Sequence, residues 1–309
     1  MLLKFSKIYF NLQPILIDFT LTHMKLFFAA LLIIFRFNYC SESLYADTIQ
    51  NKNIIEKPFP ELKTFLLDKY SKVKPGKFGE FVKGSHIKLD TDKKIVALTL
   101  DACGGYGSNG YNSALIELLR KEKIPATLFV SGKWINANAK TFEKLAADTL
   151  FEIDNHGDKH KICTITGATV YDIVGTKNVS EVIDEIEINA QRILQLTGRR
   201  PYFFRSATAF IDEASVNIAS DLDMQVVSYS VLSGDGVPAV SDTIIYQNIV
   251  RNTREGSIII MHFNHPQWNE KEGLKKAIPI LRKKGFSFVK LQDYNLLDKF
   301  EVNERMKRK

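Results

Sequence analysis

Two histidines four residues apart form the most chemically suggestive group in this sequence. His156 and His160 lie in the stretch 155–160, which reads Asn-His-Gly-Asp-Lys-His. If this stretch makes a helical turn, both imidazoles can bind one metal ion through neutral nitrogens. A zincin-type site is not indicated, because that motif needs Glu directly after the first histidine and Gly157 stands there. The pair therefore predicts a metal site of another kind.

Two further titratable residues stand where apolar runs end. Asp101 follows the run 95–100, and His262 follows the run 258–261. A single histidine is most often a surface residue, but four of the six histidines fall into two tight groups beside strand-like runs. At the ends of two buried strands, an acid and a histidine can share the base and acid roles around a metal ion. The pattern therefore favours hydrolytic chemistry.

Short apolar runs alternate with helical segments from residue 95 onward. The expected strands are 95–100, 126–130, 151–153, 203–205, 225–231, 258–261 and 286–291. The expected helices are 112–123, 139–148, 181–196, 212–221, 242–254 and 270–284. Strands without polar alternation, each followed by a helix, predict a parallel sheet covered by helices. We expect a single α/β domain, a closed or nearly closed barrel of about seven parallel strands, with its site at their carboxyl ends.

Length and charge set the limits of the chain's organisation. We divide the 309 residues into a signal peptide or anchor (1–45), a linker and lead-in (46–90), the main domain (91–295) and a basic tail (296–309). The net charge is +7, and many of the basic residues lie near the two ends. No stripe of alternating basic and aromatic residues is present, so we predict no nucleic-acid partner. We expect a monomer.

The N-terminus carries a short apolar segment typical of export. Met24-Lys25 precedes ten apolar residues, 26–35, which would span only about 15 Å as a helix against about 30 Å for a bilayer core. We therefore expect a signal peptide and a periplasmic, secreted or envelope-anchored protein. A second apolar patch at 15–19 leaves an uncleaved N-terminal membrane anchor as the alternative, and translation can start at Met1 or Met24.

The chemistry-bearing residues, in this order, resemble the motifs of polysaccharide deacetylases of the NodB-homology type (carbohydrate esterase family 4). The resemblance covers about residues 95–291. Members of that family have a distorted (β/α) barrel and use a divalent metal to hydrolyse N-acetyl groups of chitin-like or peptidoglycan sugars. The resemblance thus implies that residues 91–295 form a hydrolase domain acting on an N-acetylated glycan of the cell envelope.

The first two motifs imply a base and two metal ligands. Where the family has Thr-Phe-Asp-Asp, residues 99–102 read Thr-Leu-Asp-Ala. Asp101 matches the general base of the family. The second acid, a metal ligand in the family, is Ala102 here, and a methyl group cannot bind a cation. The second motif, His-x-x-x-His, is matched in full by His156 and His160, which are the implied metal ligands.

The third motif of the family is Arg-x-Pro-Tyr, and residues 205–208 read Arg-Ser-Ala-Thr. Arg205 matches the arginine whose charge-assisted hydrogen bond orients the base. Thr208 stands where the family offers a backbone N–H to the oxyanion. Residues 199–202 read Arg-Arg-Pro-Tyr and match the motif literally, but their place between a helix and a strand favours a structural role.

The last two motifs imply an acid–histidine pair. Asp235 would hold the ring of His262 in one tautomer and raise its basicity, and His262 would protonate the departing amine. The family's tryptophan beside this acid is Gly236 here, so that wall of the groove is lost or supplied elsewhere. His265 has no counterpart in the family, and we expect a structural role for it.

Ala102 leaves the third metal ligand open. Asp101 and Asp154 are the nearest acids in the sequence, and we favour Asp101. Zinc suits two imidazoles and one carboxylate with an open water position, so we predict zinc as the metal.

Three cysteines occur, and Cys40 lies in the expected cleavage region. Cys103 follows Asp101 by two residues, and Cys163 follows His160 by three. If the motifs converge on one ion, so do the two thiols, and we expect a disulfide in the exported protein. A thiolate ligand in place of the missing acid and two unrelated buried thiols are the alternatives.

Three functions compete on these residues. The first is a metal-dependent hydrolase that removes N-acetyl groups from peptidoglycan or a chitin-like polymer. The second is a catalytically silent relative that only binds glycan, which the changes at Ala102 and Gly236 favour. The third is an amidase or esterase with another substrate. The retained base, histidine pair, arginine and acid histidine favour the first.

Overall fold

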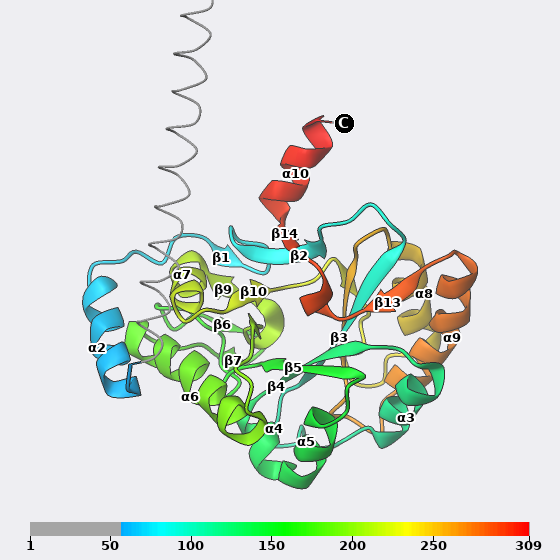
Figure 1. The fold of residues 1–309 in the computed structure, drawn as a ribbon, viewed down its shortest axis with the longest axis horizontal. Coiled ribbons are helices and arrows are strands. Elements are labelled where there is room, and N and C mark those ends of the chain that lie inside the picture. Colours follow the sequence, from blue (N-terminus) through cyan, green and yellow to red (C-terminus); the bar gives the residue numbers. More distant parts are fainter. Residues whose placement is uncertain (1–56, 309) are drawn as a thin grey trace, which may run out of the picture. The chain divides into compact units, whose positions relative to one another are not determined.

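A 10-stranded, mostly parallel sheet forms the centre of the computed structural model, which describes residues 57–308. The strand order is β11-β12-β3-β4-β5-β8-β10-β2-β14, with β13 beside β3. These strands are β2 (Ser85–Leu89), β3 (Ile95–Ala102), β4 (Ala126–Val130), β5 (Phe151–Asn155), β8 (Phe203–Phe204), β10 (Gln225–Val227), β11 (Val231–Leu232), β12 (Ile258–His262), β13 (Ser287–Val289) and β14 (Leu296–Asp298). The sheet curls into a half-barrel (Figure 1), which confirms the predicted barrel-like fold class.

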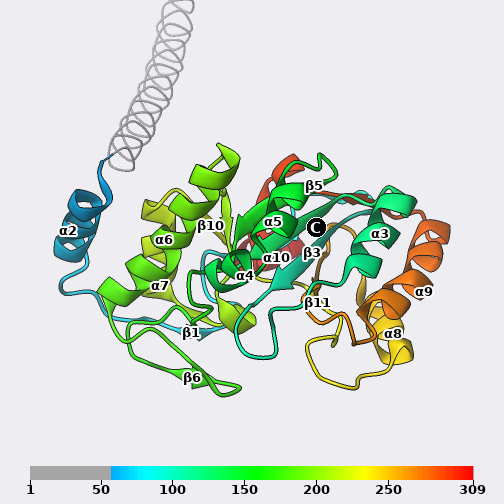
Figure 2. The same cartoon turned by 90° about the horizontal axis from the view of Figure 1, so that it is seen from below.

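Most of the helices lie along the outside of the curled sheet (Figure 2). The helices of the described residues are α2 (Phe59–Lys69), α3 (Ser113–Glu122), α4 (Gly132–Ala137), α5 (Ala139–Ala146), α6 (Val179–Thr197), α7 (Glu213–Asp221), α8 (Asp242–Asn252), α9 (Glu270–Lys283) and α10 (Lys299–Arg308). Local sequence sets several of their ends. The side chain of Asn178 accepts a hydrogen bond from the Glu181 N–H at the start of α6, and Gly198 ends that helix with φ 71°.

Two small sheets stand beside the central one. Strand β1 (Phe78–Gly79) pairs with β9 (Ile211–Asp212), and β6 (Thr169–Val170) pairs with β7 (Ile173–Val174). The second pair lies within residues 157–179, where no strand or helix was expected. Two-residue strands bury too little surface to show a clear hydrophobic alternation, so no sequence pattern indicates this hairpin.

Alternating residues of the sheet serve two hydrophobic layers. On β3, Leu98, Leu100 and Ala102 belong to the cluster that packs against the helices, whereas Ala97 belongs to a second cluster with Phe203, Val227 and Leu291. Since successive side chains of a strand point to opposite faces, Ala97, Thr99 and Asp101 share the inner face of the curled sheet. This alternation decides which residues at the end of β3 reach the site.

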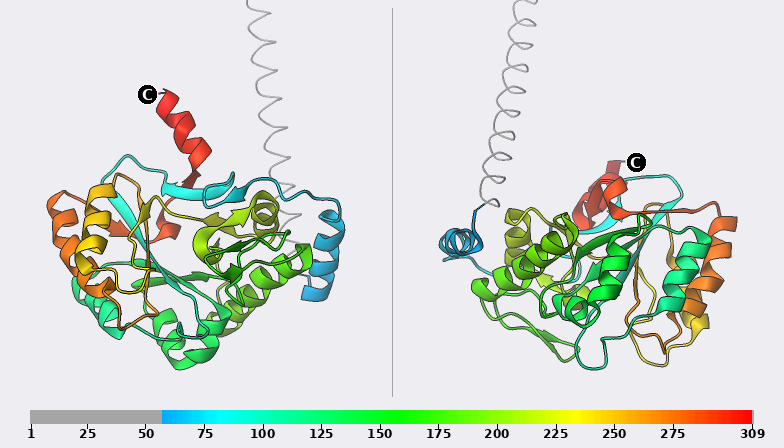
Figure 3. Two further views of the ribbon diagram at one scale, coloured as in Figure 1. Left: turned by 180° about the vertical axis from the view of Figure 1, so that it is seen from behind. Right: turned by 60° about the horizontal axis from the view of Figure 1, so that its bottom comes forward.

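The fold exceeds the predicted domain bounds at both ends. The segment expected to be a linker contains α2 and β2, and the segment expected to be a basic tail contains β14 and α10. Strand β14 pairs with β2 in the antiparallel direction, and α10 then projects away from the sheet (Figure 3). The predicted strand 225–231 is divided into β10 and β11, between which Ser230 donates its N–H to the carbonyl oxygen of Ile258.

The predicted N-terminal signal segment lies outside the described residues. Among residues 57–308, no helix has the length and apolar character needed to cross a bilayer.

Candidate active site

The predicted site residues converge at the carboxyl ends of the parallel strands. Asp101 and His262 are register partners on the adjacent strands β3 and β12. His156 follows β5 directly, and Arg205 follows β8. Asp235 lies in the loop after β11 and contacts His262. These side chains therefore meet at the carboxyl ends of the strands, where the sequence predicts the site.

Asp101 is held by a buried arginine. The Arg205 guanidinium donates from Nη1 to Asp101 Oδ1 at 2.7 Å, and both side chains are almost fully buried. Two carbonyl oxygens, of Val227 and Ser228, accept the other guanidinium hydrogen bonds, and the group stacks on Phe129 at 4.2 Å. The pairing that the resemblance implied is thus present, and it fixes the carboxylate of Asp101 in one orientation.

The two histidines of the metal motif lie against each other on a tight loop and not on a helical turn. Their ring centroids are 4.8 Å apart. Gly157 (φ 81°) and His160 (φ 53°) are both left-handed, which bends the chain back within four residues. His156 Nδ1 lies 2.8 Å from the carbonyl oxygen of Arg205, so Nε2 is the nitrogen left to bind a ligand.

A buried glutamate of α6 holds this loop in place. Glu185 accepts hydrogen bonds from the backbone N–H groups of Lys159 and Lys161, on either side of His160. A Cβ on Gly157 would collide with Glu185 Oε1, so only glycine fits there. Burial raises the pKa of Glu185 to about 7, although the two N–H groups favour its charged form. Glu185 was not predicted as a site residue. The feature that could have indicated it is its position as an acid among the apolar residues on the buried side of α6.

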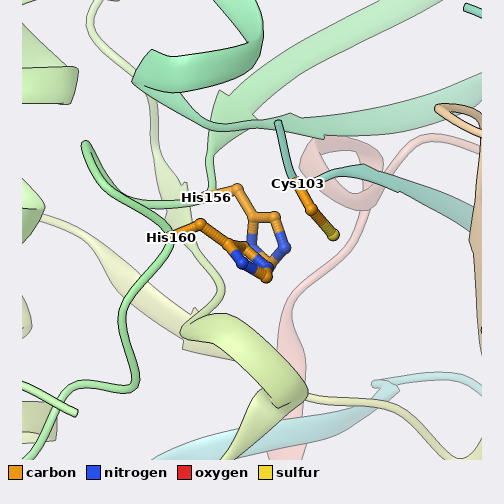
Figure 4. A group of neighbouring side chains, drawn as sticks. All are labelled: Cys103, His156 and His160. Carbon is orange, nitrogen blue, oxygen red and sulfur yellow. The ribbon is translucent and has the colours of Figure 1, made fainter. Parts of the chain in front are cut away.

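Cys103 completes a group of potential metal ligands with the two histidines (Figure 4). The ligand atoms of Cys103, His156 and His160 all lie within 4.8 Å of one another. Asp101, the third ligand that we favoured, is not in this group, and its Oδ2 lies 3.7 Å from His156 Nε2. Two imidazole nitrogens and one thiol sulfur are a donor set that zinc binds in proteins, so the residues present fit a divalent ion.

The charges around Cys103 act on its thiol. Burial alone would raise its pKa, but the charge of His160 and hydrogen bonds with His156, His160 and His262 lower it well below the ordinary value. The pKa of His156 is raised: burial disfavours its charged form, but the charge of Asp101, the interactions with Cys103 and the hydrogen bond to the Arg205 carbonyl together outweigh that effect. The thiol of Cys103 and the neighbouring imidazoles therefore favour each other's charged forms.

His262 and Asp235 form the predicted acid–histidine pair. Asp235 Oδ1 lies 3.1 Å from His262 Nδ1, and Asp235 Oδ2 accepts the His262 backbone N–H at 2.7 Å. Burial disfavours the charged imidazole, but the charge and hydrogen bond of Asp235 outweigh it and raise the pKa of His262 well above its ordinary value. A histidine that holds its proton in this way can donate it to a leaving group.

A side chain at residue 236, where the family has tryptophan, would press against the ring of His262. A Cβ on Gly236 would lie 3.0 Å from His262 Cε1. His265 instead stacks flat on Trp268, with ring centroids 3.6 Å apart, in the loop after β12. A structural role for His265 agrees with this packing.

Two other sequence candidates lie away from the ligand group. Asp154 Oδ1 accepts the backbone N–H groups of Tyr202 and Phe203, so it ties β5 to the segment before β8. Arg200, from the literal copy of the third motif, donates two hydrogen bonds to Glu187 of α6. That segment is therefore structural, as we expected.

The expected disulfide is wrong, because Cys103 and Cys163 are both free thiols. The chain leaves His160 in a left-handed conformation, and Ile162 and Cys163 then form β-bridges with Gly175 and Ile211. Cys163 is fully buried there, while Cys103 stays with the imidazoles. Strand alternation would have placed Cys103 correctly, because residues two apart on a strand share a face.

Comparison with known proteins identifies similar chains. A family model described as polysaccharide deacetylase matches residues 88–227. The chain is 28% identical to YlxY of Bacillus subtilis over 221 residues, which are 71% of this chain and 63% of YlxY, so the match spans less than two thirds of that relative. It is 24% identical to the peptidoglycan-N-acetylmuramic acid deacetylase PdaA of Bacillus subtilis over 207 residues, 66% of this chain and 72% of PdaA.

A solved structure supports the fold. A pseudoenzyme of carbohydrate esterase family 4 from Bacillus anthracis superposes with a TM-score of 0.56 at 24% identity, covering 67% of each chain.

Proposed function

We propose that this chain hydrolyses the N-acetyl groups of an amino-sugar polymer of the cell envelope, such as peptidoglycan, as a member of the polysaccharide deacetylase family, whose model matches residues 88–227. The reaction breaks the carbon–nitrogen bond of the acetamide, and it releases acetate and a free amine on the sugar. One observation carries the proposal. Asp101 and His262 are register partners at the ends of the adjacent strands β3 and β12, and each has its own partner, Arg205 for Asp101 and Asp235 for His262.

In the proposed reaction, the two acid–base residues act on the two sides of the acetamide. Asp101, oriented by Arg205, accepts a proton from the attacking water. His262 donates a proton to the departing nitrogen, while Asp235 stabilises the imidazolium and keeps its ring in place. The backbone N–H of Thr208, in the left-handed turn after Arg205 (φ 61°), is proposed to donate to the oxyanion.

A divalent metal belongs to this proposal. A structurally similar family 4 acetyl xylan esterase from Clostridium thermocellum was solved in complex with a cobalt ion, and the imidazoles of His156 and His160 are the proposed nitrogen ligands here. We propose zinc as the ion, which when bound supplies a Lewis acid that polarises the acetyl carbonyl and lowers the pKa of water. A chain with this activity acts where its substrate lies, so we also propose export through the N-terminal apolar segment.

The test is acetate release from N-acetylated peptidoglycan and from N-acetylglucosamine oligomers by the purified full chain. We expect release that a chelator abolishes and added zinc restores. The Asp101→Asn variant is the matched control, because it keeps the size of the side chain and removes the base. An Asp101→Asn variant that releases acetate at the wild-type rate, or no release from any N-acetylated glycan, would overturn the proposal.

A catalytically silent glycan-binding protein is the second candidate. Two observations favour it: Ala102 replaces an acid ligand of the family, and a structural neighbour is a pseudoenzyme. In that case oligomers would bind, as measured by calorimetry, but the metal-loaded chain would release no acetate. The two candidates therefore differ in a single assay.

A further inference from the structure

We propose that Cys103 is the third protein ligand of the metal, as a thiolate, so that the site selects a thiophilic divalent ion over Mg²⁺, Mn²⁺ or Ca²⁺. The inference deepens the proposed function, on which it rests for the presence of a metal. It replaces the carboxylate that the family motif has at residue 102 with a sulfur one residue further along the chain.

The direction of the strand end explains why residue 102 is not itself the ligand. Ala102 is fully buried, and it belongs to the hydrophobic cluster that packs against the helices. Its neighbour Asp101 instead pairs with Arg205 on the inner face. Cys103 follows, and its sulfur lies with the two imidazoles. The position that lost its acid therefore contributes to the core, and the next residue contributes a donor to the site.

The loop around Cys103 is built to hold this sulfur. Ser131 donates its hydroxyl hydrogen to the Cys103 carbonyl oxygen. Gly104 is left-handed (φ 71°), and a Cβ there would collide with the backbone nitrogen of Trp134. Only glycine fits at this position, so the chain direction after Cys103 is fixed. The thiol is held by its backbone rather than by a chance side-chain rotamer.

The donor set determines the class of metal. Magnesium, calcium and manganese prefer oxygen ligands, whereas thiolate with imidazole suits zinc and other softer ions. The nearest carboxylate, Asp101, is already bound by Arg205 at 2.7 Å. Its other oxygen, Oδ2, lies 3.7 Å from His156 Nε2 but outside the group of ligand atoms, in which the sulfur of Cys103 is the third donor.

Cys163 provides a matched control within the same chain. It is fully buried and lies outside the ligand group. Its thiol pKa is raised well above the ordinary value, first by burial and then by the negative charges of Glu185 and Asp212. A substitution at Cys163 thus removes a thiol of the same chain without touching the proposed site.

Cobalt substitution tests the inference without an activity assay. The apo chain is titrated with Co²⁺, and the near-ultraviolet sulfur-to-cobalt charge-transfer band is recorded for the wild type, Cys103→Ser, Cys103→Asp and Cys163→Ala. We expect the band in the wild type and in Cys163→Ala, and its absence in both Cys103 variants. Zinc affinity should fall in Cys103→Ser by more than the roughly 10–100-fold that loss of an outer partner causes. Cys103→Asp should bind Mn²⁺ better than the wild type does.

The results separate this inference from the proposed function. Stoichiometric Co²⁺ binding without the band, or wild-type zinc affinity in a folded Cys103→Ser variant, would overturn the thiolate ligand even if acetate is released. A thiolate band in a chain that releases no acetate would leave the ligand assignment standing and reject the enzyme. Circular dichroism of each variant shows whether it is folded, and zinc should also protect Cys103 from alkylation by iodoacetamide.

Discussion

Asp101 and Asp154 lie in the same row of the sheet, yet their surroundings differ completely. Phe129 of β4 is the register partner of Asp101 on one side and of Asp154 on the other. Asp101 receives the buried guanidinium of Arg205. Asp154 receives only backbone N–H groups, and its Oδ2 has no partner among the described residues. Burial and the neighbouring Glu152 raise the pKa of Asp154 well above its ordinary value.

The comparison shows how one residue type acquires two roles. A buried carboxylate without a cation tends to hold a proton, whereas one that is paired with arginine keeps its charge. Only the second kind can act as a base at neutral pH. Asp235 also has a basic side-chain partner, His262, whereas Oε1 of Glu270 has no partner in the described part of the chain. Partner charge, rather than residue type or burial, should therefore decide which acids matter for turnover.

The largest expected effect is the loss of acetate release when Asp101, the acid paired with Arg205, is replaced. Asp101→Asn should remove nearly all acetate release and leave the circular dichroism spectrum unchanged, because the amide keeps the shape but cannot accept the proton. Asp154→Asn is the matched control from the same row. It should keep turnover within about twofold, since a change of equal shape away from the reacting atoms acts mainly on stability. Similar losses in both variants would break the comparison.

His262→Ala should reduce turnover by about 10²–10⁴-fold, the usual contribution of one acid–base group. The reason is that the departing amine loses its proton donor, while Asp235 and the fold remain. Substrates with a more acidic leaving nitrogen should lose less activity, and kcat measured on such a series checks the role. A uniform loss across the series would argue against proton donation.

Replacing Arg205 instead of Asp101 should lower the unfolding free energy of the chain. Arg205→Met leaves Asp101 buried without its cation, and breaking a buried pair this way costs about 3–5 kcal/mol of unfolding free energy. The double variant Arg205→Met/Asp101→Asn should recover part of that loss, because no uncompensated charge remains. Urea denaturation of both variants measures the difference. A double variant no more stable than Arg205→Met would show that Arg205 stabilises the fold through its stacking on Phe129 and its hydrogen bonds to the carbonyl oxygens of Val227 and Ser228, and not through the charge of Asp101.

Much of this contrast could be predicted from the sequence, but not all of it. Strand–helix alternation located the longer strands and helices from β3 to β13 but not α4, β6, β7 or β9, because fully apolar runs such as 258–261 leave little choice of conformation and two-residue strands show no pattern. The resemblance placed Asp101, Arg205, Asp235 and His262 together, as the structure has them. It could not place Cys103, since the family motif offers no residue type for it, and the left-handed bend at His160 cannot be read from spacing.

The smallest expected effect concerns an acid without a charged partner. Burial raises the pKa of Glu270 to about 7, above the ordinary value of about 4.3. Between these two values the folded chain holds a proton that the unfolded chain has released, so this group's stabilisation is complete below pH 4 and is lost as pH rises toward 7. In the Glu270→Gln variant the side-chain amide does not ionise. Its unfolding free energy should therefore fall less steeply than that of the wild type between pH 5 and 7, by at most about 1.4 kcal/mol per pH unit. Urea denaturation at several pH values measures both slopes, with the exposed-site variant Glu304→Gln as control. Equal slopes in wild type and Glu270→Gln would show that Glu270 is charged in the folded chain, and that a buried acid here needs no cation to keep its charge.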